Sequence, residues 1–437
     1  MEQSEYARWF RDSTPYISRH RNRTFVLLLD GEALAHPNLT NIVHDIALVH
    51  VLGARLVLVH GARPQIDAAL PAGGDRFHQG RRITRADDLP RLLGVMGELR
   101  ARLEALFSTG LPTSPLRETD IGVLGGNFIT ARPVGILDGI DHELTGRVRR
   151  VHADRLNAAL DTGGLVLLSP LGYSPSGQVF NLAADELAAH VALALEADKL
   201  IVFSARGALT DAAGERISVM TPGELTRHPD AGQSPLPAVL RASRGGVPSC
   251  QLISFQEDGA LLEELYTAAG AGTQIRERRD FIRPATSADV AHIVEVIRPL
   301  EESGALVRRG RDRLEEEIDR FLVADLDGNV VGCCAVYPFD GAAELACVAV
   351  HPSYRSDEPG RSTGENETNG IGAALLAAAE ERARSLGVSR LFVLTTQARD
   401  WFLDRGFQEA DTAALPGPRQ AMYNCQRNAR VMTRDLG

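Results

Sequence analysis

The stretch 344–387 constrains the fold most, because it joins a short apolar run to an amphipathic helix through a glycine turn. Residues 345–350 are apolar and mostly small or branched, and they end before Pro352, which predicts a buried strand. Residues 371–386 place apolar side chains at helical spacing with charged ones opposite, so we expect a helix that ends at Gly387. A helix N-terminus after a strand leaves free N–H groups, which favour a bound anion.

The glycine turn at 369–372 is by itself also an ordinary strand-to-helix connection, so the residues after the helix decide its meaning. Residues 391–396 predict a second buried strand, and W-F-x-x-R-G-F at 401–407 predicts a short helix that ends in Gly-Phe. This succession resembles the GNAT-type N-acetyltransferase family, in which the glycine turn holds the coenzyme A pyrophosphate. The resemblance implies that acetyl-CoA contacts Cys347, Val348, Ala349, Val350, Asn369, Gly370, Ile371, Gly372 and Ala373.

Composition excludes several classes of protein. With 437 residues the chain is long enough for two domains, each with its own core. A net charge of −10 argues against a general nucleic-acid binder, and no apolar run is long enough to span a membrane, so we expect a cytoplasmic protein. The cysteines form no C-x-x-C pair and the histidines no ligand spacing, so we expect neither a disulfide framework nor a metal site.

Apolar runs alternate with helical patterns through the first half of the chain, which predicts an α/β domain with a mostly parallel sheet. The strands are expected at 25–29, 55–59, 121–132, 146–151, 165–169, 200–203 and 251–254. Near the N-terminus, residues 15–17 are expected to interrupt a helix because they contain Pro15.

Three segments of this half resemble the amino acid kinase family: V-L-V-H-G-A-R-P-Q-I at 57–66, and the longer stretches 165–185 and 259–275. The resemblance implies a three-layer αβα sandwich over residues 1–275. The chain departs from the kinase pattern at Leu28, where the family has a lysine, and at Asp30, where it has a glycine. An acidic Asp30 would repel ATP phosphates and Leu28 cannot neutralise them, so we expect a regulatory domain without kinase chemistry.

A charged linker is expected at 276–281, followed by a second domain at 282–437. Ser287 or Asp289 is expected to cap its first helix, which should cover 290–297, and D-G-N at 327–329 predicts a hairpin. A kinase-like half joined to an acetyltransferase half resembles the family of bacterial N-acetylglutamate synthases. The reaction implied is transfer of an acetyl group from acetyl-CoA to the amine of L-glutamate, the first step of arginine biosynthesis.

The acetyl transfer needs a base, because only the neutral amine attacks a thioester. Glu344 is the candidate base, because it lies just before the predicted strand and because the resemblance places the base of the family here. The alternative is that Glu344 is only a solvated carboxylate at the end of a strand. The resemblance makes Thr395 the donor to the leaving thiolate. Cys347 should line the substrate site without being acylated, because no histidine is close in sequence, and a strand N–H near Val348 could stabilise the oxyanion.

The two carboxylates of glutamate call for planar bidentate donors. The resemblance assigns them to Arg309 and Arg427, although each is also plausible as a surface arginine.

The kinase-like half is expected to bind L-arginine as a feedback inhibitor. Resemblance to arginine-sensitive kinases implies that Glu264 pairs with the guanidinium, that Gly270 and Gly272 present carbonyls, and that Tyr16 covers the site. It also implies a homo-oligomer, specifically a hexamer. An ordinary helix with a glycine end would show the same pattern at Glu264.

Two alternatives remain open at this level: an active amino acid kinase, and a non-catalytic arginine sensor. The polar segment 356–368, longer than in the family the chain resembles, is expected to be a tolerated excursion beside the cofactor turn.

Overall fold

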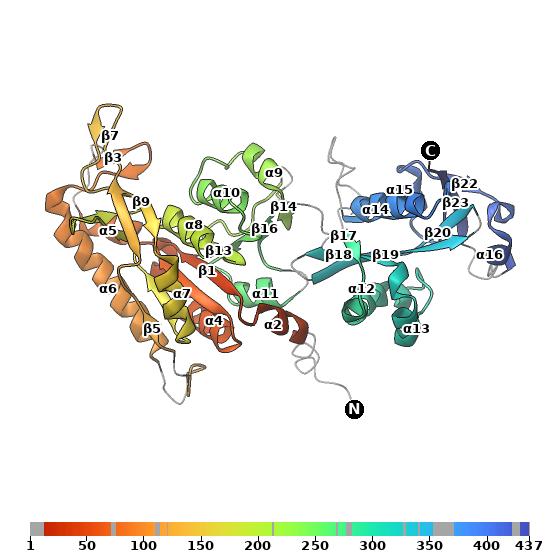
Figure 1. Ribbon diagram of the computed structural model, residues 1–437, viewed down its shortest axis with the longest axis horizontal. Helices are drawn as coiled ribbons and strands as arrows, with labels where there is room; N and C mark the ends of the chain where they lie inside the picture. Colours follow the sequence, from red (N-terminus) through yellow and green to blue (C-terminus); the bar gives the residue numbers. More distant parts are fainter. Residues whose placement is uncertain are drawn as a thin grey trace. The chain divides into compact units, whose positions relative to one another are not determined.

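The structure is a computed structural model. The chain divides into two compact units, Met1–Arg278 and Arg279–Gly437 (Figure 1). Residues are described over 13–70, 76–109, 114–119, 121–211, 214–267, 270–276, 282–326, 329–339, 341–352, 371–421 and 429–436. The predicted linker at 276–281 lies outside the described residues except for Arg276.

The first unit is built on an eight-stranded sheet in the order β14-β16-β15-β13-β1-β2-β10-β5. All neighbours are parallel except β15 and β16. The strands are β1 (Thr24–Leu29), β2 (Arg55–His60), β5 (Val123–Leu124), β10 (Leu165–Leu168), β13 (Lys199–Ser204), β14 (Val219–Met220), β15 (Ser249–Ser254) and β16 (Thr273–Ile275). Because both faces are covered, the central strands β1, β2, β10 and β13 are mostly apolar and carry their polar residues at the strand ends.

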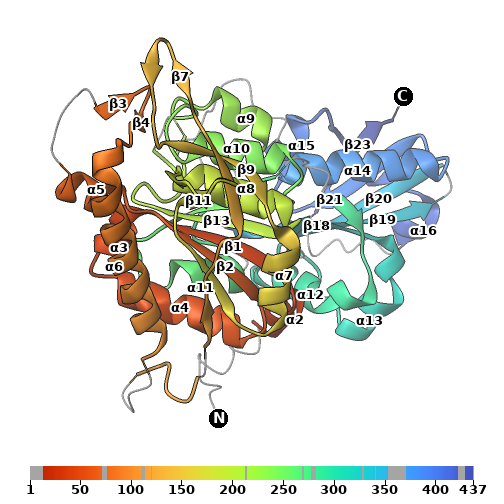
Figure 2. The same ribbon diagram turned by 60° about the vertical axis from the view of Figure 1, so that its left-hand side comes forward.

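Helices cover the two faces of this sheet (Figure 2). One face packs against α2 (Thr14–His20), α3 (Gly31–Ala35), α4 (Leu39–Val51), α5 (Arg63–Ala69), α6 (Leu89–Phe107) and α11 (Ala260–Tyr266). The other packs against α7 (Ala153–Asp161), α8 (Ala184–Ala194), α9 (Pro222–Arg227) and α10 (Leu236–Arg244). The predicted three-layer αβα sandwich is confirmed.

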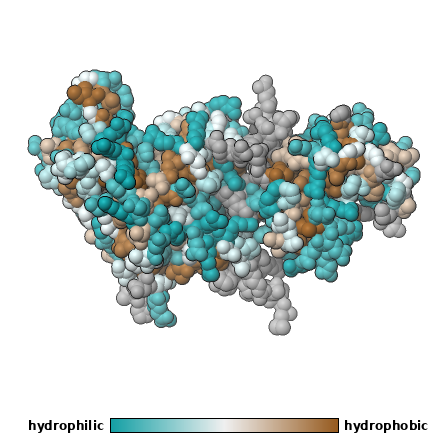
Figure 3. Space-filling model, viewed as in Figure 1, coloured by the Kyte–Doolittle hydropathy of each residue, from teal (hydrophilic) through white to brown (hydrophobic). Residues whose placement is uncertain are grey.

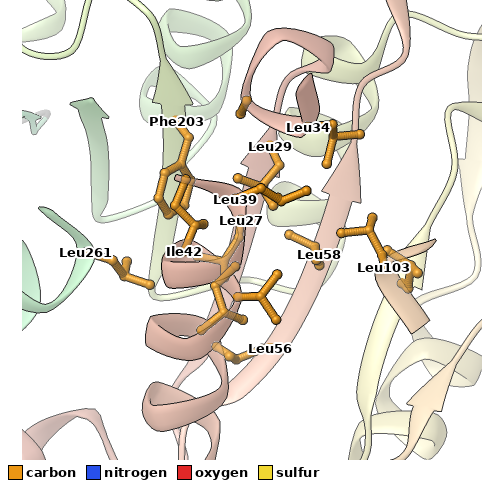
Figure 4. Close-up of a cluster of buried hydrophobic side chains, with 14 of the residues drawn as sticks. Leu27, Leu29, Leu34, Leu39, Ile42, Leu56, Leu58, Leu103, Phe203 and Leu261 are labelled. Atoms are coloured by element: carbon orange, nitrogen blue, oxygen red, sulfur yellow. The ribbon is translucent and has the colours of Figure 1, made fainter. Parts of the chain in front are cut away.

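Alternation along the central strands assigns each side chain to one of two cores. Figure 4 shows Leu27 and Leu29 of β1 beside Leu58 of β2 and Ile42 of α4 in the first core. Leu28 points to the opposite face and is 3% exposed, so the residue at the kinase lysine position is part of a core.

Smaller elements lie at one end of the first unit. They are a four-stranded sheet of β12 (Val179–Asn181), β11 (Leu171–Tyr173), β6 (Ile129–Pro133) and β9 (Gly146–Val151), a hairpin of β3 (Phe77–His78) and β4 (Arg81–Arg82), and a hairpin of β7 (Ile136–Leu137) and β8 (Ile140–Asp141). Figure 3 shows hydrophobic atoms at the tip that carries β7, where Ile136 and Ile140 are exposed.

The second unit has a seven-stranded sheet in the order β17-β18-β19-β20-β21-β23-β22, antiparallel except for the pair β20 and β21. The strands are β17 (Ile282–Pro284), β18 (Phe321–Leu326), β19 (Asn329–Phe339), β20 (Ala342–Val350), β21 (Arg390–Thr395), β22 (Gln408–Ala410) and β23 (Arg430–Asp435). The helices are α12 (Val290–Glu302), α13 (Arg311–Glu316), α14 (Ile371–Ser385), α15 (Arg399–Leu403) and α16 (Gly417–Ala421). Helices α12 and α13 lie on the opposite side of the sheet from α14 (Figure 1).

Two bounds were predicted wrongly, at 121–132 and at the end of α12. The strand expected at 121–132 is two strands, β5 and β6, which belong to different sheets. Residues 15–17 lie in α2, whose first turn accommodates Pro15 because that position needs no N–H partner, and the helix expected before them lies outside the described residues. Asp289, one of the two predicted caps, is the N-cap residue of α12, although its side chain makes no cap hydrogen bond to that helix. Thr286 and Asp289 form the capping box of the short 3₁₀ turn before it. Helix α12 continues past the predicted end at Ile297 and contains Pro299.

Within the described residues, no helix is long and apolar enough to cross a membrane.

Candidate active site

Strands β20 and β21 run parallel but pair over only three residues of each. The register joins Ala342 to Arg390 and ends where Glu344 meets Phe392. Among the described residues, β20 has no pair with β21 beyond Glu344, although β20 stays paired with β19 as far as Val350. The β21 side of β20 is therefore unpaired along the described residues that were predicted to bind the cofactor.

A β-bulge interrupts β20 at Cys347. Cys333 pairs with Ala349 and Ala335 pairs with Ala346, so Cys347 and Val348 both stand opposite Cys334. Cys347 has a φ of +50°, a conformation that costs a residue with a side chain about 1–3 kcal/mol. A bulge redirects side chains, and here it packs Cys347 into the core under α12.

The sulfur of Cys347 meets Arg309, the arginine predicted to bind a substrate carboxylate. Nη1 of Arg309 lies 2.6 Å from Sγ of Cys347, and the backbone N–H of Arg309 donates to Oε1 of Glu301 at 2.8 Å. Nε of Arg309 is buried and has no hydrogen-bond partner within the described chain. A guanidinium edge without an acceptor is suited to a carboxylate ligand.

The thiol of Cys347 is protonated at neutral pH. Burial is the largest cause that raises its pKa to about 11, and the Arg309 guanidinium opposes that shift only in part. Glu301, Glu317 and Glu344 also raise this pKa, so all three carboxylates lie within electrostatic reach of the thiol. A protonated thiol is a poor nucleophile, which favours direct attack by the amine over an acylated cysteine.

Glu344 forms an ion pair that the sequence did not reveal. Nε and Nη2 of Arg419, on α16, donate to its two carboxylate oxygens at 2.6 and 2.9 Å. Both side chains are mostly buried, with 12% of Glu344 and 21% of Arg419 exposed. An amine that transfers a proton to Glu344 must therefore reach carboxylate lone pairs that Arg419 does not use, or displace Arg419.

Thr395 is buried at the end of β21, where it pairs with Arg430. Its Oγ1 accepts a hydrogen bond from the N–H of Ala398 at 2.9 Å, which ties the turn before α15. The hydroxyl proton stays available, because a hydroxyl both accepts and donates. The geometry thus gives Thr395 a structural contact and leaves the predicted donor role possible.

The glycine turn is described in part. Ile371, Gly372 and Ala373 form the first turn of α14, and a Cβ on Gly372 would come within 3.1 Å of Trp401. Asn369, Gly370, Arg427 and the segment 356–368 lie outside the described residues.

The predicted arginine site lies around α11. Oε2 of Glu264 accepts from the N–H groups of Ala271 and Gly272 at 2.8 Å each, and no hydrogen bond within the described residues involves its Oε1. Burial raises the pKa of Glu264, against the effect of these hydrogen bonds and of Lys199 and Arg216.

The carbonyl of Gly270, predicted to bind the effector, accepts from Nη1 of Arg216 at 2.7 Å. Gly270 has a φ of +58° and its position leaves no room for a Cβ beside Glu264. Tyr16 is buried on α2 in the same core as Leu265 of α11. The structure therefore brings Glu264 and Gly270 together and adds Arg216, which the sequence did not indicate, while α2, the helix that carries Tyr16, contacts α11.

A cavity of about 730 Å³ lies at the carboxyl ends of β1, β2 and β13. Asp30 lines it and caps α3 by accepting from the N–H of Ala33 at 2.8 Å, and burial raises its pKa. A Cβ on Gly61 would lie 2.7 Å from the N atom of Gly31, so these two turns pack against each other. Leu28 and Asp30 thus occupy structural positions at the place where a kinase would hold phosphates.

No group of three or more His, Cys, Asp or Glu side chains among the described residues is arranged to hold a metal ion. The side chains that sequence reasoning missed, Arg419, Tyr337, Glu301 and Glu317, come from distant segments. Only the spacing of Arg313 and Glu317 on one helix gave a local signal.

The second unit, with its parallel pair that separates beside a bulged strand, is a GNAT-type acetyltransferase domain. Residues 23–254 match the amino acid kinase family, and residues 289–360 match the acetyltransferase (GNAT) family. The chain belongs to the amino-acid acetyltransferases and is an enzyme of that family.

The relatives cover the whole chain. Amino-acid acetyltransferases from Azotobacter vinelandii and Pseudomonas aeruginosa are each 45% identical over 99% of this chain and 100% of their own length. The crystal structure of N-acetylglutamate synthase from Neisseria gonorrhoeae with coenzyme A and L-arginine is 34% identical, covers 99% of this chain and 100% of its own, and superposes with a TM-score of 0.78. Its complex with coenzyme A and N-acetyl-glutamate has a TM-score of 0.61.

Proposed function

We propose that this enzyme transfers the acetyl group of acetyl-CoA to the α-amine of L-glutamate and releases N-acetyl-L-glutamate and coenzyme A. The observation that carries the proposal is the cluster at the bulge, where Glu344 and Cys347 lie with Arg309, whose Nε has no hydrogen-bond partner among the described residues. The relatives that bind coenzyme A and N-acetyl-glutamate support the identity of both ligands.

The amine nitrogen attacks the thioester carbon directly. Glu344 takes one proton from the ammonium group, the neutral amine forms the C–N bond, and the C–S bond breaks. The departing thiolate takes the second proton released by the amine nitrogen, while the Thr395 hydroxyl is proposed to donate a hydrogen bond to the sulfur. Arg309 holds one carboxylate of the substrate, and Arg427 is proposed to hold the other. The open edge of β20 at 347–350 and the first turn of α14 are proposed to bind the cofactor.

Incubation of the purified chain with acetyl-CoA and single amino acids tests this assignment. We expect thiol release with L-glutamate and a product with the mass of N-acetyl-L-glutamate, and weaker turnover with L-aspartate or L-glutamine. Absence of thiol release with L-glutamate, or a clear preference for another amino acid, would contradict the proposal.

We also propose that L-arginine inhibits the enzyme through the first unit. The support is the Glu264 carboxylate, which accepts from Ala271 and Gly272 and lies beside Gly270, together with the relative that binds L-arginine. Kinase activity is disfavoured, because Leu28 is in the core and Asp30 caps a helix. Acyl-phosphate formed from ATP and N-acetyl-L-glutamate would overturn this part of the account.

A homo-oligomer, a hexamer by family resemblance, and a cytoplasmic location remain predictions. Light scattering on the eluted protein measures the assembly, and a monomer mass would contradict it.

A further inference from the structure

The buried guanidinium of Arg309 lacks a full set of hydrogen-bond acceptors among the described residues. A thiol sulfur is a weak hydrogen-bond acceptor, yet Sγ of Cys347 is the partner of Nη1. Nε is buried without an acceptor in the described part of the chain. Leaving such a donor unpaired is unfavourable, so the side chain is held in place by other contacts until an acceptor arrives.

Tyr337 is a second side chain, after Cys347, that interacts with Arg309. Arg309 and Tyr337 interact electrostatically, and the Tyr337 hydroxyl donates to Oε2 of Glu317 at 2.6 Å. The single hydroxyl proton is therefore committed to Glu317, and the oxygen lone pairs remain for the guanidinium. Burial, followed by the hydrogen bond to Glu317, raises the pKa of Tyr337, so the hydroxyl stays protonated.

Glu317 is itself fixed from the other side. Nε of Arg313 donates to its Oε1 at 3.1 Å, four residues away on adjoining helical turns. Burial acts to raise the pKa of Glu317, but the hydrogen bonds from Tyr337 and Arg313 outweigh it and hold that pKa below its ordinary value. A permanent carboxylate thus keeps the tyrosine proton directed away from Arg309.

Tyr337 also lies beside the candidate base. It pairs directly across the ladder with Glu344, and directly paired residues of antiparallel strands project on the same face. Tyr337, which interacts with Arg309, and Glu344, which would take the amine proton, are therefore neighbouring side chains on one sheet face.

We propose that Tyr337, with its proton held by Glu317, is a positioning residue that orients Arg309 toward a carboxylate of the amino-acid substrate. The inference rests on the proposed function and adds two residues, Tyr337 and Glu317, to its recognition apparatus. Tyr337 does not take part in proton transfer.

The variant Tyr337→Phe tests it, because phenylalanine keeps the buried ring and removes only the hydroxyl. The KM for L-glutamate should rise about tenfold, the loss expected when a charged group loses one hydrogen-bonding contact. The kcat should change by less than about twofold and the acetyl-CoA KM should stay constant, since binding alone is weakened. Glu317→Gln should act in the same direction, whereas Glu315→Gln, on exposed turns of α13, should behave as wild type.

Substrate analogues separate positioning from packing. L-Glutamine lacks the side-chain carboxylate and isoglutamine lacks the α-carboxylate, so the preference for L-glutamate over one of them should shrink in Tyr337→Phe. A merely structural role would leave both preferences unchanged.

An active wild type with an unaltered glutamate KM and unaltered preferences in Tyr337→Phe would overturn this inference alone. So would a parallel rise of the acetyl-CoA KM, because that result indicates general distortion. A wild type that does not acetylate L-glutamate would instead contradict the proposed function.

Discussion

Arg419 shows how single side chains from distant segments decide the chemistry of this site. It pairs with Glu344 across 75 residues of sequence, and nothing in the short helix that carries it indicates the partner. The candidate base, the buried arginine and the cysteine were predicted from motifs. Their contacts were not, because ion pairs between segments depend on the tertiary fold and leave no periodic signal.

A double-mutant cycle measures the Glu344–Arg419 pair. Removing one partner leaves a mostly buried charge, so Arg419→Ala should lower the stability of the second unit by about 1–3 kcal/mol. Glu344→Gln should reduce that cost, which calorimetric unfolding of the single and double variants would show. Arg390→Ala, whose partner Asp435 is 76% exposed, is the control and should cost less than about 1 kcal/mol. Additive effects of the two substitutions would contradict a coupled pair.

The structure agrees best with the predicted helices and strands where the apolar pattern extends over many residues. The central strands and α14 lie where their patterns predicted, because burial on both sides of a sheet and on one face of a helix leaves a strong pattern. The bulge at Cys347 was not predictable, since a single extra residue in an apolar strand does not change its composition. The two strands within 121–132 were merged although Gly125-Gly126-Asn127, a turn signal, stands between them.

Helix α4 carries a carboxylate whose charge interacts with Asp258, which precedes α11. Burial, with a further contribution from the charge of Asp258, raises the pKa of Asp45 on α4 to about 7. The folded state therefore binds this proton more tightly than the unfolded chain, so this side chain contributes stability that is lost as the pH rises from about 4 to about 7.

Asp45→Asn should remove that dependence. The variant should unfold at a higher temperature than wild type at pH 8 and at a similar temperature at pH 4, which thermal unfolding at the two values would measure. Asp87→Asn alters an exposed carboxylate of the same unit and is the control. A variant that is less stable than wild type at pH 8 would contradict a raised Asp45 pKa.

At the scale of the whole molecule, the two units have separate cores and separate sites. An effector acts at a distance by binding two states of an enzyme with different affinities. To inhibit acetyl transfer in the second unit, L-arginine bound to the first unit would have to shift the equilibrium between an active and an inactive state. The sequence predicted the architecture of both units from family motifs. It did not predict that Arg216 would engage the Gly270 carbonyl, since the two residues are 54 positions apart.

Arginine titration of the acetyltransferase rate tests this coupling. Glu264→Ala removes the carboxylate proposed to bind the effector, so half-maximal inhibition should need at least about tenfold more L-arginine, the loss expected for a charged hydrogen-bonded pair. Glu263→Ala changes the exposed neighbour on α11 and should inhibit as wild type does. Equal inhibition of Glu264→Ala and wild type would remove this residue from the effector site.

The central claim is that acetyl transfer to L-glutamate takes place at the Glu344 face of β20. The most direct test measures coenzyme A release and N-acetyl-L-glutamate formation together, in wild type, in Glu344→Gln and in the control Glu381→Gln on the exposed side of α14. Equal amounts of both products are expected in wild type and in the control. In Glu344→Gln the kcat should be lower by about 10²–10⁴ with acetyl-CoA binding retained, the loss typical of a missing general base. Full activity of Glu344→Gln, or coenzyme A release without N-acetyl-L-glutamate, would contradict the claim.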